Sequence, residues 1–450
     1  MAAKSDKVSP ARQAAYHALL RVETEASYTS YLLHSEAVGR LSEPDRRLTT
    51  ELVMGVLRWQ RQLDWMIENY AGRPAGALDR AARIILRMAL YQLQFLTRVP
   101  AHAAVHEAVE LARSVRAHRV SGFINAVLRR SQRDPGLRDR MALIKDPVRR
   151  LSVTASHPEW LAARWIERYG AERAQAWMLA NNVPPATALH VNRRRATSEA
   201  VLRRLAEAGV ECRPSEYFPD AWRVAGSPPA VTALAGEGLV HLQDEASRRV
   251  PTLLGEIGGQ RLLDVCAAPG GKTIVMSQAA GDAGRVLATD LYESRQRLMR
   301  ARLEALGCAN VWAVVADARA GLPVRQLFDA ALVDAPCSGL GTLRRNPEIK
   351  WRVTEADLVP LSEKQRALLE ATAAVVRPGG LLLYSTCSTE PEENEAVVED
   401  FRRAHPEFSA IRPAPAPAAE KFLDPATGYF RTFPTDPGLD GFFAALLRRA

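Results

Sequence analysis

The alternation of short apolar runs and helical stretches after residue 255 restricts the fold of this 450-residue chain more than any other feature. Five runs have the character of strands, with helical stretches between them: RLLDVCAA, RVLATDL, NVWAVVAD, FDAALVDA and GLLLYSTC. Apolar strands that alternate with helices indicate a parallel sheet covered by helices. We therefore expect a doubly wound α/β domain over residues 241–450.

The rest of the chain has a different pattern. In residues 1–145, apolar residues recur at three- and four-residue spacing, and breakers such as AGRPAGALD separate the segments, so an all-α bundle is predicted. Residues 146–240 combine helical stretches with strand-like runs such as ATALHVN and LVHLQD, which indicates a small α+β module. The Pro/Ala-rich run at 412–420 is predicted to be a surface loop.

The net charge of +9 is located in one part of the chain. Residues 1–150 contain 25 Lys/Arg and 15 Asp/Glu, whereas residues 151–450 contain 35 and 36. A basic N-terminal module suggests a polyanionic partner such as nucleic acid, and a solvated basic surface is the alternative.

Apolar runs and cysteines exclude several classes of protein. No run reaches the roughly 18 apolar residues of a membrane span, and the N-terminus lacks the pattern of a signal peptide, so we expect a cytoplasmic protein without a membrane partner. The cysteines are odd in number, without CxxC or zinc spacing, so we expect free thiols and no metal. They are Cys212, Cys266, Cys308, Cys337 and Cys387.

The first predicted strand of the α/β domain runs into a glycine turn. The turn consists of Cys266, Ala267, Ala268, Pro269, Gly270, Gly271 and Lys272. A glycine turn between a strand and a helix lets a ligand approach the backbone and directs helix amides at it. A phosphate-binding Walker loop would need glycine six residues before Lys272, where Cys266 stands. The turn therefore favours another ligand.

An acid ends each of the next three strands: Asp290, Asp317 and Asp334. Ligands of open α/β sheets bind at the carboxyl ends of strands, and Asp290 lies 20 residues after Gly270, where an acid can hold a ribose. Any one of these residues could instead cap a helix or a turn. Three together beside a glycine turn favour an adenosine-type ligand.

Two cysteines also lie at strand ends, Cys337 in DAPCSG and Cys387 in YSTCS. A buried strand-end cysteine is usually inert, but two in polar turns on neighbouring strands favour thiol chemistry. The loop after Cys337 contains Arg344-Arg345 and Lys350-Trp351. The arginines could contact RNA phosphates and Trp351 a base or sugar, and structural packing of Trp351 is the alternative.

The motifs DVCAAPGGKT, DAPCSGLGTLRRNPEIKW and YSTCS, in this order and spacing, resemble the RNA cytosine-C5 methyltransferases of the Nol1/Nop2/Sun family. The closing segment DGFFAALLRR resembles the same family. The resemblance implies a Rossmann-like sheet, S-adenosylmethionine as cofactor, and transfer of a methyl group to carbon 5 of a cytosine.

The resemblance also implies a role for each motif residue. The turn from Cys266 to Lys272 would surround the methionine part of the cofactor. Asp290 would take the ribose, Asp317 would lie beside the adenine, and Asp334 would reach towards both cofactor and target base.

For the two cysteines, the resemblance implies that Cys387 is the nucleophile and that Cys337 assists release. DNA cytosine methyltransferases place the nucleophile in the Pro-Cys position, so the reverse assignment is an alternative.

SGFINAVLRR and the basic helical character of the first region resemble the antitermination factor NusB. A NusB-like bundle fused to such a catalytic domain implies a bacterial enzyme of the small ribosomal subunit. Its partner would be 16S ribosomal RNA or an assembly intermediate, not DNA, and we expect a monomer.

Two other functions are the alternatives: a non-catalytic RNA- or transcription-factor-binding protein, and a DNA cytosine or other methyltransferase. The two strand-end cysteines argue against a non-catalytic binding protein. The TCS motif and the helical bundle argue against a DNA methyltransferase.

Overall fold

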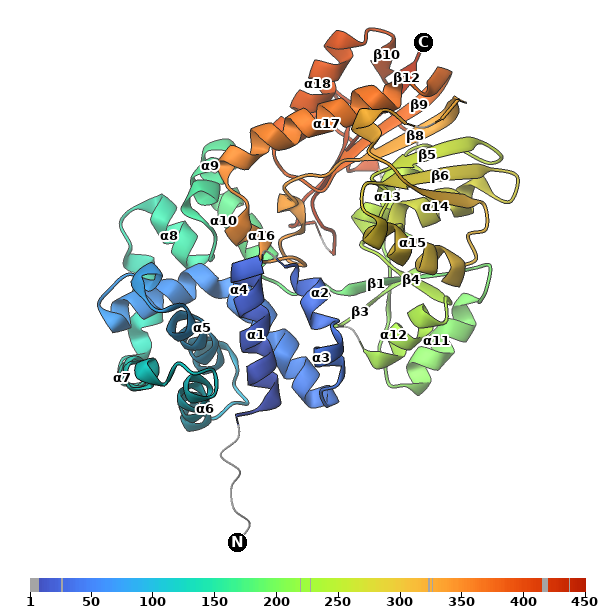
Figure 1. Cartoon of the computed structure of the whole chain (residues 1–450). Coiled ribbons are helices and arrows are strands. Elements are labelled where there is room, and N and C mark those ends of the chain that lie inside the picture. The colour runs from blue at the N-terminus through green and yellow to red at the C-terminus, as the bar shows by residue number, and fades with distance from the viewer. Residues whose placement is uncertain are drawn as a thin grey trace. The chain divides into compact units, whose positions relative to one another are not determined.

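The computed structural model describes residues 8–450 except residues 26, 219, 227, 323, 326, 415–419 and 437. The surface loop predicted at 412–420 falls mostly on residues outside this description. The chain divides into two compact units (Figure 1). Unit 1 comprises Met1–Val183 and Leu343–Glu355, and unit 2 comprises Pro184–Thr342 and Ala356–Ala450. In the described part of the chain, no helix is long and apolar enough to cross a membrane.

Unit 1 is built from helices throughout its described residues. Its helices are α1 (Pro10–Glu25), α2 (Thr29–Leu33), α3 (Glu36–Gly39), α4 (Glu43–Ala71), η1 (Ala75–Ala77), α5 (Arg80–Phe95), α6 (Ala101–Ser114), η2 (His118–Val120), α7 (Ser121–Arg133), η3 (Pro135–Leu143), α8 (Pro147–Thr154), α9 (Glu159–Tyr169), α10 (Ala171–Asn181) and α16 (Ile349–Arg352).

Local sequence signals explain where the longest helix of unit 1 begins and ends. The Ser42 side chain accepts a hydrogen bond from the Asp45 amide at the start of α4, and Gly72 ends the helix in the left-handed region at φ 70°. Within α4, a Cβ atom on Gly55 would lie 2.0 Å from the Tyr91 ring of α5. Glycine at this position therefore permits the close packing of α4 against α5.

Part of the positive charge of unit 1 is used inside it. Arg87 is 5% exposed and binds Asp64 with two nitrogen atoms, at 2.7 and 2.8 Å, and Glu23 at 2.6 Å. Such a fully bonded guanidinium is a structural group. The basic excess of the N-terminal region is thus only partly a surface property.

Unit 2 begins with a small four-stranded sheet in the order β2-β3-β1-β4, paired antiparallel. Two helices pack on it through an apolar core of its own. The elements are β1 (Thr187–Val191), α11 (Ser198–Glu207), β2 (Arg213–Pro214), β3 (Ala221–Val224), α12 (Pro229–Gly236) and β4 (Val240–Leu242).

The large sheet of unit 2 has the order β10-β12-β9-β8-β5-β6-β7, and β11 pairs with β12. The five strands β5 to β9 are parallel, as expected, but β12 runs antiparallel to β9, so the sheet is mixed. Its strands are β5 (Arg261–Val265), β6 (Arg285–Asp290), β7 (Val311–Val315), β8 (Phe328–Asp334), β9 (Val376–Thr386), β10 (Phe408–Ala410), β11 (Phe430–Thr432) and β12 (Phe442–Arg449).

Helices cover the two faces of this sheet unequally (Figure 1). Residues of α14 and α15 pack on one face, and residues of α17 and α18 pack on the other through a core that includes Leu368, Val397 and Phe401. The helices of this part are α13 (Glu245–Thr252), α14 (Gly271–Ala280), α15 (Glu293–Ala305), η4 (Ala318–Ala320), η5 (Leu340–Thr342), η6 (Glu355–Asp357), α17 (Leu358–Ala373), η7 (Pro391–Glu393) and α18 (Glu395–Ala404).

The compact units do not follow the domain limits expected from the sequence. The helices α8 to α10 lie beyond residue 145, yet they belong to unit 1, and so does the segment 343–355 from within the expected catalytic domain. Helical periodicity cannot reveal this, because it identifies a helix but not the core against which the helix packs. The limits 1–145, 146–240 and 241–450 stay predictions.

Candidate active site

The glycine turn after β5 adopts a backbone that few residues allow. Cys266 has φ 62° and Gly270 has φ 93°, both in the left-handed region. A Cβ atom on Gly270 would lie 2.7 Å from Cγ of Met299 on α15, so glycine is required for this packing. α14 begins at Gly271 directly after the turn, and its N-terminus provides the positive end of a helix dipole there.

Asp290 at the end of β6 is tied to this turn, as the sequence predicted for one shared site. Its side chain is buried, and one carboxylate oxygen accepts a hydrogen bond from the Ala268 amide at 3.2 Å. The other oxygen accepts one from the Tyr292 amide at 3.1 Å, and Arg295 lies 3.5 Å away. The carboxylate thus stabilises the turn and stands beside the edge at which a ligand would bind.

Asp317 follows β7 and caps the short helix η4. Its carboxylate accepts hydrogen bonds from the Arg319 guanidinium and from the Arg319 amide at 3.0 Å, and these lower the pKa of this half-buried acid. The Ala316 amide binds the carbonyl oxygen of Asp290, so the two acids lie on adjacent strand ends. The capping alternative for Asp317 therefore has support, and its contact with adenine stays a prediction.

Asp264 is a buried acid that the sequence reasoning did not identify. It lies within β5, and its Oδ2 accepts a hydrogen bond from the Thr273 hydroxyl at 2.6 Å. Its Oδ1 is buried and has no hydrogen-bond partner among the described residues. Burial raises the pKa of Asp264 to about 7. An acid inside an apolar strand, RLLDV, was the signal that could have revealed it.

A series of side-chain hydrogen bonds connects the glycine turn, the end of β8 and the end of β9. Lys272 of the turn donates to Oδ2 of Asp334 at 2.7 Å, and the Ser385 hydroxyl of β9 donates to Oδ1 of the same acid at 2.9 Å. The Lys272 ammonium also lies 5.0 Å from the Phe442 ring centroid. Asp334 thus lies between the turn and the end of β9, and its contacts with cofactor and target base stay predictions.

The two strand-end cysteines lie side by side. The sulfur atoms of Cys337, after β8, and Cys387, after β9, are 3.2 Å apart. The hydrogen bond to Cys387, together with burial, raises the pKa of Cys337 well above the usual thiol range. The two thiols are in direct contact, so one can donate a hydrogen bond to the sulfur atom of the other.

A buried carboxylate holds the two cysteine turns, and the sequence reasoning missed it. Glu393 accepts hydrogen bonds from the Ser338 amide at 2.8 Å, from the Ser338 hydroxyl, from the Ser388 hydroxyl and from Gln365 at 3.0 Å. Ser338 and Ser388 directly follow Cys337 and Cys387. Burial raises the pKa of Glu393. The acidic run PEENE directly after YSTCS was the available signal.

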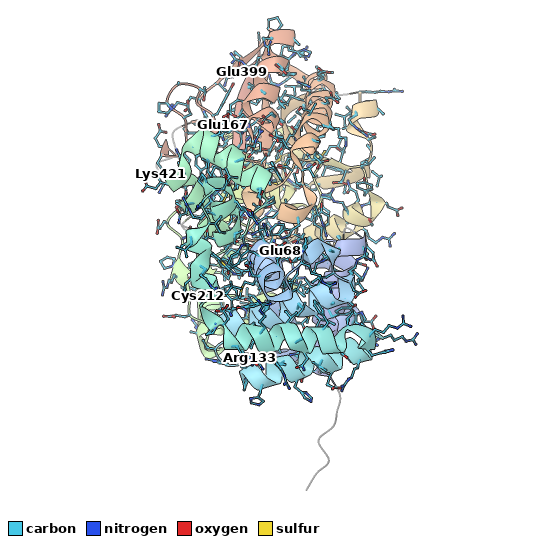
Figure 2. The ribbon with its side chains drawn as sticks, turned by 90° about the vertical axis from the view of Figure 1, so that its left-hand side faces the viewer. Glu68, Arg133, Glu167, Cys212, Glu399 and Lys421 are labelled. Atoms are coloured by element: carbon cyan, nitrogen blue, oxygen red, sulfur yellow. The ribbon has the colours of Figure 1, made fainter. Side chains whose placement is uncertain are left out.

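The remaining three cysteines lie apart from this pair. Cys212 belongs to the small sheet region near β2 (Figure 2), and Cys308 is buried against α15. Burial raises the pKa of both. Burial also raises the pKa of Cys266 to about 12, so this residue stays a thiol at neutral pH.

The basic residues after the Pro-Cys motif do not form an exposed loop. Lys350 is 1% exposed, and its ammonium donates to the carbonyl oxygens of Arg58 and Ser156 and to Asn182, at 2.8–2.9 Å. The Trp351 indole donates to the Leu57 carbonyl at 2.7 Å and packs on the core of unit 1. The packing alternative is correct for Trp351. Arg344 is also buried.

These features define the class of the C-terminal domain. A parallel sheet continued by an antiparallel β12, a glycine turn after β5 and an acid at the end of β6 form a Rossmann-like cofactor-binding edge. The unbonded Oδ1 of buried Asp264 and the α14 N-terminus supply polar groups beside the turn, and these fit an S-adenosylmethionine-type ligand. Two thiols lie at the same edge of the sheet.

Comparisons with known proteins agree with this class over the whole chain. Residues 251–448 match the family described as 16S rRNA methyltransferase RsmB/F, residues 9–133 match the NusB family, and residues 157–231 match the RsmF/B-like ferredoxin-like domain.

Named relatives extend over almost the full length. The probable ribosomal RNA small subunit methyltransferase B of Bacillus subtilis is 35% identical over 453 aligned residues, covering 98% of this chain and 99% of that protein. Ribosomal RNA small subunit methyltransferase B of Pseudomonas putida is 38% identical, covering 81% and 82%. The crystal structure of PH0851 superposes with a TM-score of 0.81 at 27% identity, covering 98% and 99%.

The chain therefore belongs to the RsmB/F family of 16S rRNA methyltransferases. It is an S-adenosylmethionine-dependent enzyme with an N-terminal NusB domain, a ferredoxin-like module and a mixed-sheet methyltransferase domain. The expected fold class, enzyme class and cofactor are confirmed.

Proposed function

We propose that this enzyme methylates carbon 5 of a cytosine in 16S rRNA through a covalent adduct between Cys387 and carbon 6, and that Cys337 assists release. The observation that supports this best is the 3.2 Å approach of the two sulfur atoms at adjacent strand ends. A methyltransferase that acts on a nitrogen or a ribose oxygen has no need of two adjacent thiols.

The first step makes carbon 5 reactive. Carbon 5 of cytosine is a weak nucleophile, and addition of a Cys387 thiolate to carbon 6 converts the ring into an enamine. As the ring accepts electrons, N3 takes a proton that comes from Lys272, 2.7 Å from Asp334, and passes through the Asp334 carboxylate. S-adenosylmethionine supplies an electrophilic methyl group, which carbon 5 then takes.

The second step reverses the addition. A thiol on Cys337 stabilises the Cys387 thiolate before attack, and that thiolate in turn holds the proton on Cys337. Once Cys387 is a thioether, this charge is gone, so Cys337 can lose its proton to water and accept the proton from carbon 5. The carbon 6–sulfur bond then breaks, the ring double bond returns, and Cys387 leaves as a thiolate. The proton on N3 returns through Asp334 to Lys272.

We assign the cofactor to the edge formed by the turn and the strand-end acids. Cys266 to Lys272 surround its methionine part, Asp290 binds the ribose, Asp317 lies by the adenine, and Asp334 faces both cofactor and base. The positions of the turn and of Asp290 support this assignment.

The substrate and surroundings follow from the family. The enzyme acts on ribosomal RNA, and we propose 16S rRNA or an assembly intermediate as its partner rather than DNA. The monomeric state, the cytoplasmic location and RNA binding by the basic N-terminal region are part of the same proposal.

The decisive experiment separates the two cysteines. Purified Cys387→Ala and Cys337→Ala enzymes are incubated with 16S rRNA and S-adenosylmethionine and run on a denaturing gel, with Cys212→Ala as the matched control. We expect a protease-sensitive protein–RNA band from Cys337→Ala, none from Cys387→Ala, and full turnover by Cys212→Ala. Bisulfite sequencing identifies the methylated carbon.

Other gel outcomes contradict the proposal. An adduct from Cys387→Ala but not from Cys337→Ala would reverse the two roles. Cys337, in the Pro-Cys position, would then be the nucleophile, as in DNA cytosine methyltransferases. No adduct from either variant, with cofactor still bound, argues against covalent catalysis.

A further inference from the structure

One part of the parallel sheet lacks a helix on one face. The connection from β7 to β8, residues 316–327, contains only the three-residue helix η4 among its described residues. A doubly wound sheet ordinarily places a helix in each such connection, because parallel strands are apolar on both faces. The face of β6 and β7 that this helix would cover is therefore left without one.

The side chains on this uncovered face are more exposed to solvent than those on the opposite face. Leu287 of β6 stands opposite Trp312 of β7 in the strand register, so the two share one face. Their neighbours Val286 and Ala288 point to the other face and are fully buried in cores that include residues of α14 and α15. Trp312 by contrast is 50% exposed. Leu327, which lines the same surface, is 40% exposed. Apolar side chains gathered in one exposed patch mark a surface that a ligand or partner covers.

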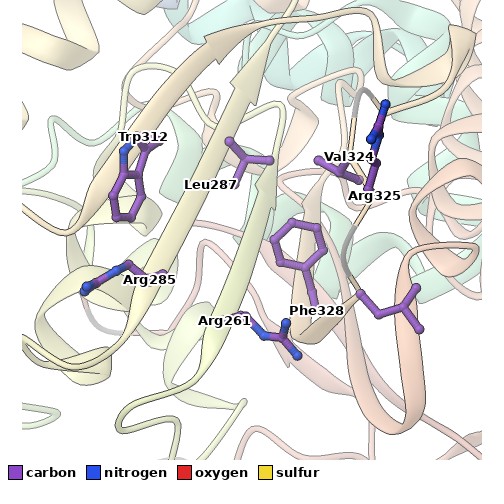
Figure 3. A pocket seen from close by; sticks show the side chains of 8 residues that line it. Arg261, Arg285, Leu287, Trp312, Val324, Arg325 and Phe328 are labelled. Carbon is purple, nitrogen blue, oxygen red and sulfur yellow. The ribbon is translucent and has the colours of Figure 1, made fainter.

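The surface is hollowed into a pocket of about 350 Å³ (Figure 3). Apolar side chains form most of its lining, with three arginines among them. No acidic residue is present among the described residues that line it: Arg261, Arg285, Leu287, Trp312, Val324, Arg325, Leu327 and Phe328. The guanidinium of Arg285 lies 5.5 Å from the Trp312 ring centroid. An aromatic face with arginines and no acid in the lining is complementary to a stacked base with its phosphates.

The pocket and the catalytic edge lie at opposite ends of the strands. Arg261, Arg285 and Phe328 are the first residues of β5, β6 and β8, and Trp312 is the second residue of β7. The turn and the cysteines follow the last residues of β5, β8 and β9. A strand of five residues spans roughly 16 Å. Anything bound in the pocket therefore lies away from the target nucleotide.

We propose that this pocket binds a single-stranded segment of the RNA substrate, several nucleotides from the target cytosine. One base stacks on Trp312, and Arg285 and Arg325 contact the flanking phosphates. The interaction adds to substrate affinity and takes no part in methyl transfer. It depends only on the RNA substrate, not on the roles assigned to the two cysteines.

The charge of the pocket favours RNA over a second copy of this chain. A symmetric dimer formed through this face would bring the same patch against itself and oppose two sets of three arginines. The polyanionic substrate has the opposite charge. Arg261 lies 3.8 Å from Asp329 and is partly balanced, so Arg285 and Arg325 are the better residues to test.

The test measures RNA affinity in the full-length enzyme, with transcribed 16S rRNA and a short single-stranded oligonucleotide as probes. We expect Trp312→Ala to weaken binding about tenfold and Trp312→Phe to restore most of it, because a phenyl ring still stacks. Arg285→Gln with Arg325→Gln should lower the salt slope by about 1.4, since each of the two phosphates that an arginine no longer neutralises reduces it by about 0.7. KM for RNA should rise while kcat and cofactor affinity stay unchanged.

Matched controls are Val359→Ala, an exposed apolar residue of α17, and Arg403→Gln, an exposed arginine of α18. Wild-type affinity and salt slope in the Trp312 and double arginine variants would overturn the proposal. So would a dimer of the wild type that Trp312→Ala dissociates without change in RNA affinity. Where Trp312→Ala does not fold, the affinity and salt slope of the double arginine variant decide the proposal. The adduct gel is independent of these results, so failure of either proposal can be told from failure of the other.

Discussion

Two halves of one continuous stretch, residues 334–342 and 343–355, belong to different compact units. The first half carries Cys337 and is fixed in unit 2 by the buried carboxylate of Glu393, which accepts hydrogen bonds from two serine hydroxyls, an amide and a glutamine. The second half is fixed in unit 1 by the buried ammonium of Lys350, which donates to two carbonyl oxygens and an asparagine.

The difference lies in what each buried charge holds. Glu393 binds the residues that directly follow the two cysteines, so its hydrogen bonds set the geometry of the proposed chemistry. Lys350 binds a backbone oxygen of α4, a backbone oxygen of the turn after α8 and a side chain, so it fixes a chain segment to a helical core. A buried charge with all its hydrogen bonds made is tolerated, whereas loss of its partners is costly. This comparison predicts different consequences for the two residues.

Glu393→Ala should have the largest effect. It leaves the donors of Ser338, Ser388 and Gln365 without their acceptor, and we expect unit 2 to lose about 3–5 kcal/mol of stability. Glu393→Gln keeps one acceptor oxygen and should fold, with kcat lowered about 100-fold or more and cofactor affinity unchanged. Methyl transfer assays and calorimetry measure this. Glu399→Gln on α18 is the control, and wild-type kcat in Glu393→Gln would show that the carboxylate is dispensable for cysteine placement.

Lys350→Met should lower the free energy of unfolding of unit 1 and should affect methyl transfer less than the Glu393 variants do. It removes a buried ammonium, and two carbonyl oxygens and the Oδ1 of Asn182 lose this donor, so we expect a loss of about 3 kcal/mol from unit 1. Urea unfolding measures it, with the exposed Lys364→Met as the control. Affinity for S-adenosylmethionine should be unchanged. A cofactor affinity that falls in parallel with stability would remove the distinction between the two halves.

Asp264 is a buried acid of which only one carboxylate oxygen has a hydrogen-bond partner among the described residues. Burial raises its pKa from 3.8 to about 7, so the folded state holds a proton that the unfolded state releases from about pH 4 upward. This contribution to stability is present below pH 4 and is lost as pH rises towards 7. Between pH 5 and 7 wild type should lose about 2 kcal/mol relative to Asp264→Asn. Equal pH dependence of urea unfolding in both proteins would mean that Asp264 is ionised when folded.

Thr29→Val should have the smallest effect. Glu348 of the second half accepts hydrogen bonds from the Thr29 amide at 3.0 Å and from the Thr29 hydroxyl at 2.8 Å. Valine keeps the volume and the amide but removes the hydroxyl, so we expect a loss of about 1 kcal/mol from unit 1. Thr24→Val, on the exposed surface of α1, is the control. A loss as large as that of Lys350→Met would indicate that Glu348, rather than Lys350, is the main anchor.

The comparison also changes how the basic N-terminal region can be tested. Removal of residues 1–145 would take away Thr29, Leu57 and Arg58, which bind the segment 343–355. Such a truncation cannot separate RNA binding from folding of that segment. Substitution of exposed arginines on α7, which ends at Arg133 (Figure 2), keeps the core and alters only the charge.

Much of the fold and site could be predicted because the signals are local. Strand–helix alternation indicated the α/β domain, three-to-four spacing indicated the bundle, and strand ends pointed to Asp290, Asp334 and the two cysteines. Parallel strands bring their carboxyl ends to one edge, so residues far apart in sequence could be expected to meet there. Asp264 and Glu393 were missed because burial and hydrogen bonding of a carboxylate depend on neighbours that periodicity does not identify.

The sequence by itself determined the class of fold, the cofactor edge and the pair of candidate thiols, because turns, caps and strand ends are encoded by adjacent residues. Only the tertiary structure decided that residues 343–355 leave the catalytic unit, that Trp351 packs on a helical core, and that Trp312 lines a basic pocket. These outcomes depend on which apolar surfaces find partners when the whole chain packs. That competition is settled by contacts between residues distant in sequence, and no local pattern records it.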